Sequence, residues 1–322
     1  MPIELRNVAL FGAAGAIGTA LGTELQRRGI PFRAVGRSRE KLQKTFGAMP
    51  LAEIFPADLA QGRDAGAAAR GVDTIVYCLG LPYPSHQLHP VLIRTTLEAA
   101  RLVGVPRLIL PSSVYSYGVP RTSRVAETHP REPHTRKGRY RKQQEDLVLH
   151  AHGSGLATMI LRLPDFYGPD ADIGLANPIF RAALAGKTAN WAGPINTPHE
   201  FVYTPDVGPV LADLAVCEDA YGQAWNFAGV EPINSMDFIT RVYRAVGKSP
   251  KYRAVGAGML KVLGLFDPTM KEVVEMLYLQ ETPVLLDDSK LRARITVRKT
   301  SYDDGIQRTL DWMRLPGVRL AG

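Results

Sequence analysis

Short apolar segments alternate with amphipathic ones through the first half of the chain. Short apolar runs are typical of strands buried in a parallel sheet, and the amphipathic segments between them are typical of helices. The expected strands are Val8–Phe11, Phe32–Val35, Glu53–Phe55, Thr74–Leu79, Arg107–Leu110 and Ala157–Leu161. Three expected helices are each followed by a glycine, a common helix stop: Thr19–Arg28, Pro90–Val103 and Lys137–His152. The alternation predicts an α/β fold, a doubly wound parallel sheet with helices on both faces.

A glycine-rich turn joins the first expected strand to the first helix. Glycines stand at positions 12, 15 and 18, directly after an apolar run. Glycines let the backbone turn sharply and approach a pyrophosphate, and free N–H groups at a helix start attract its negative charge. Strand, glycine turn and helix in this order predict a dinucleotide site of Rossmann type, with the spacing G-x-x-G-x-x-G. The residues predicted to hold the cofactor here are Gly12, Ala14, Gly15, Ala16, Ile17 and Gly18.

The residues after the second strand indicate which dinucleotide is bound. NAD sites usually carry an Asp or Glu at the end of this strand, but here Gly36 is followed by Arg37 and Ser38. A guanidinium pairs with the 2′-phosphate of NADP through charge-assisted hydrogen bonds, whereas an acid would repel it. We therefore expect NADP(H), with NAD less favoured, and Arg37 and Ser38 in the cofactor site.

Two further strand ends are expected along the path of the cofactor. Asp58 and Leu59 follow the third strand, where the carboxylate would either meet the adenine edge or cap the next helix. Cys78, Leu79 and Gly80 end the fourth strand at the rim. We expect Cys78 to be a buried thiol rather than a nucleophile, because no histidine lies near it in the sequence.

The alternation stops after Gly168, where prolines become frequent. A helix over Thr204–Cys217, with Pro205 and Asp206 in its first turn, predicts a return to the sheet. From Pro232 on, the sequence predicts a small and mostly helical region. We therefore expect a Rossmann core over residues 1–168 with a return segment at about 197–230. The expected substrate-binding cap comprises residues 169–196 and 231–322.

Composition and charge narrow the class of protein. The 322 residues are 45% hydrophobic and 22% charged, which is ordinary for a globular protein. The net charge of +8 comes largely from a basic stretch between Arg121 and Lys142, but no nucleic-acid motif accompanies it. Without an apolar run long enough for a bilayer or a leader segment, and with only two cysteines, we expect a cytoplasmic protein that binds neither nucleic acid nor membrane. No metal-ligand spacing is present in the sequence.

Several segments in order resemble one family, the extended short-chain dehydrogenase/reductases, or NAD(P)-dependent epimerase/dehydratase family. The glycine motif matches. The sequence Pro-Ser-Ser-Val-Tyr-Ser-Tyr-Gly over residues 111–118, after the fifth expected strand, resembles the family's Ser-Ser-x-x-x-Tyr-Gly. Residues 162–169 resemble its Arg-x-x-Asn-x-Tyr-Gly-Pro, with Asp165 in place of Asn, and 199–207 and 225–229 resemble later segments. The resemblance extends to about residue 235. It implies a homodimer formed through the helices Pro90–Val103 and Lys137–His152.

The resemblance also implies a catalytic Ser, a Tyr that acts as acid or base, and a Lys four residues after the Tyr. The serine role falls on Ser113, which would bind the reacting oxygen. No Tyr-x-x-x-Lys is present, because Tyr140 is followed four places on by Gln144. Alignment on Glu145 puts Lys137 in the Tyr place and Arg141 in the Lys place. We expect Arg141 to hold ribose hydroxyls, and either Lys137 or Tyr140 to carry the proton; the alternative is that this face only binds cofactor phosphates or faces solvent.

Other candidates lie near the same expected cleft. Pro164 and Asp165 follow the sixth strand, where the resemblance places the nicotinamide. The candidates for substrate contact are Tyr83, Tyr115, Phe166 and His199. His199 either faces substrate or caps a turn, and Tyr117 is expected to pack.

The sequence therefore predicts an NADP-dependent oxidoreductase that moves hydride to or from a small carbonyl or alcohol. Two alternatives stay open. One is an epimerase or dehydratase of a sugar derivative with tightly bound NAD(P). The other is a non-catalytic NADP-binding sensor or scaffold, which the missing Tyr/Lys pair suggests.

Overall fold

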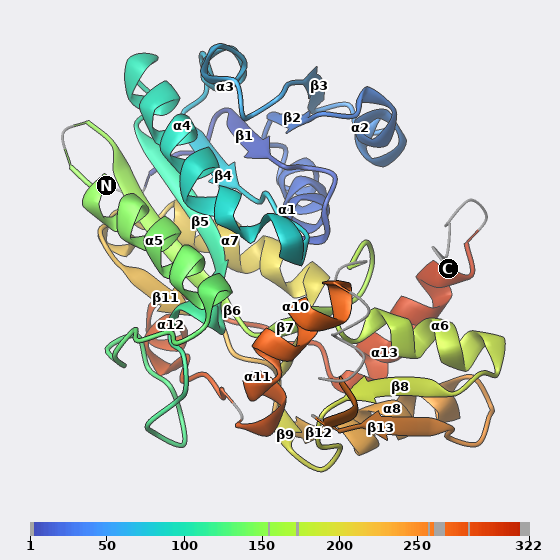
Figure 1. Ribbon diagram of the computed structural model, residues 1–322. Coiled ribbons are helices and arrows are strands. Elements are labelled where there is room, and N and C mark those ends of the chain that lie inside the picture. Colours follow the sequence, from blue (N-terminus) through green and yellow to red (C-terminus); the bar gives the residue numbers. More distant parts are fainter. Residues whose placement is uncertain are drawn as a thin grey trace.

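The computed structural model describes residues 3–153, 155–171, 174–256, 258–260, 268–282 and 284–315, with the backbone alone for 268–270. Helices cover both faces of a central sheet, and a smaller cap packs beside its carboxyl edge (Figure 1). In the described residues, no helix is both long and apolar enough to cross a membrane.

The central sheet has seven parallel strands in the order β11-β6-β5-β4-β1-β2-β3. This order confirms the predicted doubly wound fold. The strands are β1 Val8–Phe11, β2 Phe32–Gly36, β3 Ala52–Pro56, β4 Thr74–Tyr77, β5 Arg107–Ser113, β6 Ala157–Leu163 and β11 Ala224–Asn226. β5 and β6 extend beyond their predicted ends because they pair residue by residue up to Ser113 and Leu163. β4 ends two residues before the predicted Leu79.

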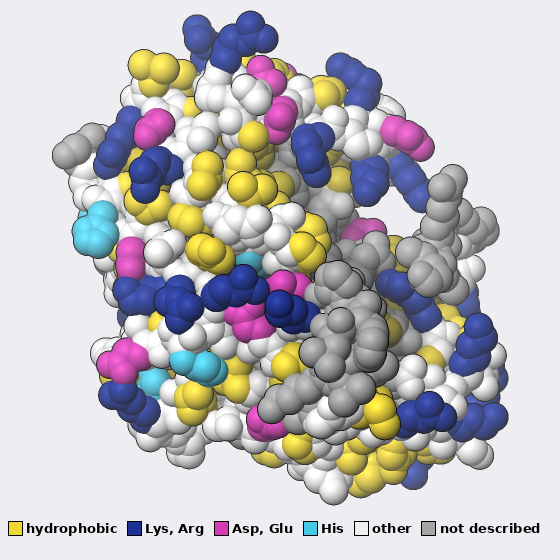
Figure 2. Space-filling model, in the orientation of Figure 1, with side chains coloured by type: hydrophobic (Ala, Val, Ile, Leu, Met, Phe, Trp, Pro, Cys, Tyr) yellow, Lys and Arg dark blue, Asp and Glu magenta, His cyan; other side chains and the backbone are white. Residues whose placement is uncertain are grey.

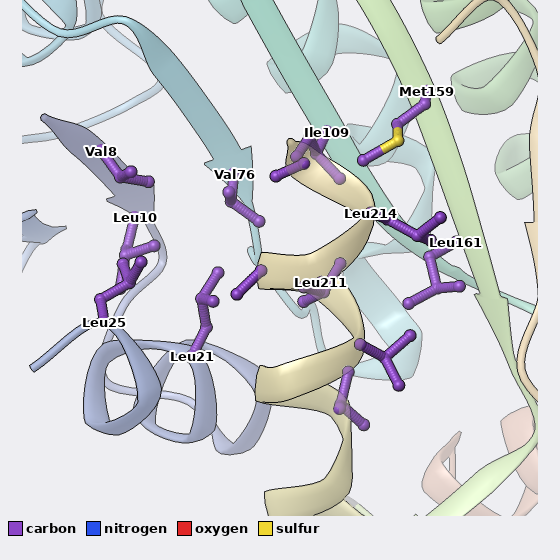
Figure 3. Packing of buried hydrophobic residues seen from close by; sticks show 14 of the residues in the cluster. Val8, Leu10, Leu21, Leu25, Val76, Ile109, Met159, Leu161, Leu211 and Leu214 are labelled. Atoms are coloured by element: carbon purple, nitrogen blue, oxygen red, sulfur yellow. The ribbon is translucent and has the colours of Figure 1, made fainter. Parts of the chain in front are cut away.

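Apolar side chains fill the space on each face of the sheet. On one face, Figure 3 shows Val8 and Leu10 of β1 packed with Leu21 and Leu25 of α1, and β5 and β6 packed against α7. On the other face, the neighbouring strand residues pack against α3, α4 and α5. The helices of the core are α1 Ala16–Arg27, α2 Arg39–Phe46, α3 Gly62–Ala69, α4 His89–Leu102, α5 Arg136–His150 and α7 Val207–Ala215. Burial on both faces explains why the strands are continuously apolar.

Four short 3₁₀ turns lie between these elements: η1 Tyr83–Leu88, η2 Val114–Ser116, η3 Thr204–Asp206 and η4 Glu218–Ala220. Two of them follow strands at the carboxyl edge of the sheet: η1 comes after β4, and η2 directly follows β5. Chain segments at this edge of a parallel sheet are the usual place for a ligand site.

The cap has its own apolar core, in which Phe180, Phe238 and Tyr302 are buried. Its helices are α6 Asn177–Ala185, α8 Ser235–Ala245, α10 Pro268–Met276, α11 Tyr278–Glu281, α12 Ser289–Arg294 and α13 Tyr302–Met313. Short strands pair in three two-stranded sheets: β7 Asp165–Tyr167 with β10 Phe201–Tyr203, β8 Ala189–Ala192 with β13 Tyr252–Val255, and β9 Pro198–His199 with β12 Ile233–Asn234. α12 lies against β11, and its Leu291 is buried in the core of the central sheet. Figure 1 shows α10 between the start of α5 and the rest of the cap.

Candidate functional site

The turn from β1 to α1 is shaped by three glycines with different tasks. Gly12 has φ +82°, and a Cβ on it would lie 2.8 Å from the Cα of Leu79. A Cβ on Gly18 would lie 2.2 Å from the carbonyl oxygen of Ala13, so this glycine lets α1 approach the strand end. By contrast, a Cβ on Gly15 would meet only the Gly12 carbonyl oxygen, at 3.7 Å. Gly15 therefore borders open space at the start of α1, where a dinucleotide pyrophosphate would lie.

The first turn of α1 leaves its N–H groups available. Its N-cap residue, Gly15, supplies no side-chain hydrogen bond, and the turn contains no acidic residue. The first N–H groups of a helix have no partner inside it and attract an anion. These backbone groups and the space at Gly15 fit the diphosphate of a dinucleotide. Ala14, Ala16 and Ile17, the other predicted residues of this turn, are half-buried beside them.

The loop after β2 places one free cation near the predicted adenosine end. Arg37 is exposed and makes no hydrogen bond or ion pair within the described part of the chain. Ser38 caps α2, its hydroxyl accepting from the Lys41 N–H at 3.2 Å. The guanidinium of Arg37 is therefore available to an anion, and the hydroxyl of Ser38 already has a backbone partner.

The other predicted rim residues lie where β3 and β4 end. The Asp58 carboxylate accepts from the N–H of Ala60 at 3.1 Å, which stabilises the turn before α3, and Leu59 is buried. Leu79 lies against Gly12, and Gly80 is exposed. Burial raises the pKa of the Cys78 thiol to about 12. The thiol therefore stays protonated at neutral pH, which supports the expectation that it is not a nucleophile.

Ser113 and its neighbour Ser112 point to different surroundings at the end of β5. The Ser112 hydroxyl donates to the buried Glu145 carboxylate at 2.6 Å. The Ser113 hydroxyl is buried and has no hydrogen-bond partner among the described residues. An unpaired buried hydroxyl lowers the stability of the folded state unless a ligand forms a hydrogen bond with it. The Ser113 hydroxyl is therefore free to bind a ligand oxygen, and its predicted role stays a prediction.

Two tyrosines and a lysine form a cluster beside the end of β5. The hydroxyls of Tyr83 in η1 and Tyr115 in η2 lie 3.1 Å apart. The Lys137 ammonium lies 5.1 Å from the centre of the Tyr83 ring. Burial raises the pKa of Tyr83 to about 12 and that of Tyr115 well above its ordinary value. Both phenols are therefore protonated at neutral pH and can donate hydrogen bonds.

Lys137 is held by carboxylates from the cap. Its side chain is almost fully buried and donates to Glu275 Oε2 at 2.6 Å, and it also pairs with the Glu272 carboxylate. The Lys137 N–H donates to Glu275 Oε1 at 3.0 Å. Through these bonds α10 fixes the cation at the predicted place of the catalytic tyrosine. The two glutamates follow Lys137 by 135 and 138 residues, so no local sequence signal identified them.

Arg141 is buried and already has several partners. Its guanidinium donates to Gln144 Oε1 at 2.6 Å and to Ser112 Oγ at 3.2 Å, and it lies 3.3 Å from His89 Nδ1. Burial lowers its pKa, but an arginine stays charged. These contacts anchor α5 to β5 and α4. Its predicted contact with ribose hydroxyls stays a prediction.

A buried ionic network supports the same strand ends. Arg162 donates to the Glu145 carboxylate at 2.9 Å and to the Tyr117 hydroxyl at 2.8 Å, and Tyr117 donates to Asn226 Oδ1 at 2.8 Å. The arginine and the Ser112 hydroxyl lower the pKa of Glu145 in spite of its burial. Tyr117 packs as expected.

Asp165 lies two residues beyond Leu163, the register partner of Ser113. Its side chain forms no hydrogen bond within the described residues, and burial raises its pKa to about 6. Its charge in turn raises the pKa of Tyr83 and of Tyr115, so the carboxyl lies within electrostatic range of both hydroxyls, without a direct hydrogen bond to either in the described structure. Pro164, directly before it, is buried.

Three predicted residues are not joined to this cluster by any contact in the described structure. Tyr140 is half-buried on α5 and makes no hydrogen bond or ring contact there. Phe166 packs partly against the core of the sheet. His199 is buried in the cap beside Trp191, and burial lowers its pKa to about 4.

His86 was not among the predicted site residues, yet it packs against the cluster. Its ring lies 5.3 Å from that of Tyr83 and 6.4 Å from that of Tyr115. Burial and the nearby cations Arg141 and Lys137 lower its pKa to about 4. The only sequence signal for it was its place in the loop after β4. No cluster of metal-binding residues exists in the described part of the chain.

The basic stretch before and along α5 is largely neutralised by acidic partners. Figure 2 shows Lys and Arg side chains in a row across this face, with acidic side chains beside them. Arg131, Arg136 and Lys142 pair with carboxylates, as Lys137 does.

Comparison with known proteins identifies a family and several relatives of this chain. A model of the NAD(P)H-binding family matches residues 12–175. The 3beta-hydroxysteroid-dehydrogenase/decarboxylase isoform 1 of Arabidopsis thaliana is 28% identical over 294 residues, which cover 80% of this chain but 66% of the plant protein. The 3 beta-hydroxysteroid dehydrogenase/Delta 5→4-isomerase of Mycobacterium tuberculosis is 26% identical over 284 residues, covering 81% of this chain and 75% of that protein.

A solved structure confirms the fold. The dTDP-glucose 4,6-dehydratase of Streptomyces venezuelae, with NAD and TYD bound, superposes with a TM-score of 0.80. It is 20% identical, and the match covers 96% of this chain and 97% of that one. The likeness extends through the cap, which the sequence resemblance did not reach.

Proposed function

This chain belongs to the NAD(P)H-binding family and has the extended short-chain dehydrogenase/reductase fold, and from that premise we propose that it is an NADP-dependent oxidoreductase acting on a carbonyl or alcohol. The observation that carries the proposal is the buried Ser113 hydroxyl, which lacks a partner in the described chain. It lies at the carboxyl edge of the sheet, beside two phenols and a cation. An oxygen that develops negative charge would find donors there.

The loop after β2 supports NADP over NAD. Gly36 stands where NAD sites usually carry an acid, and Arg37 directly follows it and is free of partners in the described chain. Its guanidinium would bind the 2′-phosphate, while Gly15 and the N–H groups of α1 would bind the diphosphate. When bound, the dinucleotide supplies or accepts a hydride at its nicotinamide ring.

The roles of the remaining residues follow from their places. Ser113 would donate a hydrogen bond to the reacting oxygen. Lys137, held as a cation by Glu272 and Glu275, would stabilise negative charge on that oxygen or on a neighbouring phenol. Of the two predicted proton carriers, Lys137 belongs to the cluster, and the structure offers no contact that supports Tyr140.

The names of the sequence relatives suggest a first substrate probe. Both are described as 3β-hydroxysteroid dehydrogenases. A secondary alcohol on a rigid apolar ring is therefore the first compound to try. This chain spans only part of the plant protein, so its activity is proposed here on the site and not taken over from the relative.

The experiment is to follow NADP⁺ reduction with a 3β-hydroxysteroid, using the wild type and three serine variants. Ser113→Ala should lower kcat/KM about 100-fold without changing NADPH affinity, because removing one donor to a developing oxyanion costs that order. Ser113→Thr should retain part of the activity. Ser116→Ala, which removes another buried unpaired hydroxyl, is the matched control. Full activity in Ser113→Ala contradicts the role of Ser113, and copurified dinucleotide without net turnover would indicate an epimerase or dehydratase instead.

A further inference from the structure

On α5 the place of the family's catalytic tyrosine is taken by Lys137, and Tyr140 of the same helix makes no hydrogen bond or ring contact with the cluster in the described structure, so the proton of the proposed reaction needs another carrier. Lys137 occupies the tyrosine place, but its ammonium is bound to the Glu272 and Glu275 carboxylates and to the Glu272 carbonyl oxygen at 3.2 Å. Removing its proton would break ion pairs in a buried place, which is costly.

The Tyr83 and Tyr115 hydroxyls lie in the same cluster. They come from η1 and η2, the segments that follow β4 and β5, and are 3.1 Å apart. Tyr115 is two residues after Ser113 and so belongs to the same strand end. A hydroxyl next to the residue that binds the reacting oxygen meets the first requirement of a general acid, which is reach.

A carboxyl group follows the neighbouring strand. Asp165 follows β6 beside the end of β5, and its side chain is free of hydrogen bonds in the described structure. Its charge acts on both hydroxyls. With a pKa raised to about 6 by burial, Asp165 exchanges protons close to neutral pH.

We propose that Tyr115 carries the proton of the reaction, hydrogen-bonded to Tyr83, and that Asp165 supplies the proton that Tyr115 gives up. This inference rests on the proposed function. In reduction, the carbonyl carbon gains a hydride, the π electrons of the C=O bond move to oxygen, and that oxygen takes the proton of Tyr115. The Tyr115 phenolate then takes a proton from a bridging water, which takes the carboxyl proton of Asp165, because no direct hydrogen bond joins the two side chains; Asp165 is reprotonated from solvent. The carbonyl has then gained one hydride and one proton, and oxidation reverses each step.

The carboxyl–phenol coupling is testable without a substrate by ¹⁹F NMR of protein labelled with 3-fluorotyrosine. The resonance missing from Tyr115→Phe identifies Tyr115. In the wild type it should shift with a midpoint near pH 6, and this step should vanish in Asp165→Asn. It should also differ between the NADP⁺ and NADPH complexes, because a cationic nicotinamide favours the phenolate. The exposed Tyr252, on the cap, is the internal control and should show neither change.

The activity arm uses the 3β-hydroxysteroid probe. Tyr115→Phe should lower kcat about 1,000-fold and leave NADPH affinity unchanged, within the range known for general acid–base groups. Tyr83→Phe should lose about tenfold. Asp165→Asn restores the residue that the family resemblance predicts, so retained activity in it would overturn the role of Asp165.

The proposal is overturned if the Tyr115 resonance responds neither to pH nor to the redox state of the cofactor, or if the responding resonance is that of Tyr140. If instead the proposed function is wrong, NADPH does not bind, while the pH-dependent shift of the Tyr115 resonance can still be measured in the free protein.

Discussion

At the scale of single residues, the site contains polar side chains that lower the stability of the folded protein. Asp165 is a half-buried carboxyl without a hydrogen bond in the described chain, and its pKa is raised to about 6 from an ordinary 3.8. The Ser113 hydroxyl, at the end of the neighbouring strand, is also unpaired within the described residues. Residues that lower stability in this way are common at functional sites, where they are retained for their chemistry.

The raised pKa of Asp165 has a definite effect on stability. Burial favours the neutral carboxyl over the charged one. The stability of the folded state that this neutral form allows is therefore fully present below about pH 4 and is lost as the pH rises through about 6. Above that range the buried charge costs up to about 3 kcal/mol, from the size of the pKa shift. Asp165→Asn should therefore raise the free energy of unfolding at pH 8 and change it little at pH 4, measured by urea denaturation.

The exposed Asp303 provides the control for this prediction, since its side chain is 78% accessible. Asp303→Asn should have little effect at either pH. If Asp165→Asn raises the free energy of unfolding equally at pH 4 and pH 8, the charge of the carboxylate is not the cause.

At the scale of elements, Lys137 and two glutamates join α5 to α10. The cation is almost fully buried, and the carboxylates are mostly so. In a buried pair, removing one partner leaves an uncompensated charge, whereas removing both is often nearly neutral. The contact therefore fixes where α10 lies more than it adds to net stability.

A set of variants tests this element contact. Lys137→Met should destabilise the protein by about 3 kcal/mol, because two mostly buried carboxylates lose their buried cation and keep only the more distant, exposed Arg136. The triple variant Lys137→Met, Glu272→Gln, Glu275→Gln should recover most of that loss, as read from thermal unfolding. If the triple variant is as unstable as Lys137→Met alone, packing rather than charge explains the effect.

Local patterns predicted much of the core and less of the site. The apolar runs gave the core strands because each one is buried on both faces, and the glycine turn and Ser113 were recognised from adjacent residues. The partners of Lys137 could not be predicted, since Glu272 and Glu275 reach it only through the packing of α10. Asp165 was recognised from its place after β6, but the pairing of Tyr83 with Tyr115 was not, because it depends on the packing of η1 against α4, α5 and α10.

At the scale of the whole molecule, the core supplies the groups that fit a dinucleotide, and the cap reaches the core through α10. The glycine turn and Arg37 come from β1, α1 and β2, while α10 brings acidic groups to Lys137. The predicted homodimer through α4 and α5 stays a prediction.

The most direct test of the account is a calorimetric titration of NADPH and NADH into the wild type, Gly15→Ala and Arg37→Ala. Gly15 has φ −103°, which alanine adopts, and its Cβ would point into the predicted pyrophosphate space. NADPH should bind the wild type at least about tenfold more tightly than NADH, and Arg37→Ala should remove that preference. Gly15→Ala should remain folded and bind neither. Tighter binding of NADH, or unchanged binding in Gly15→Ala, would contradict the account.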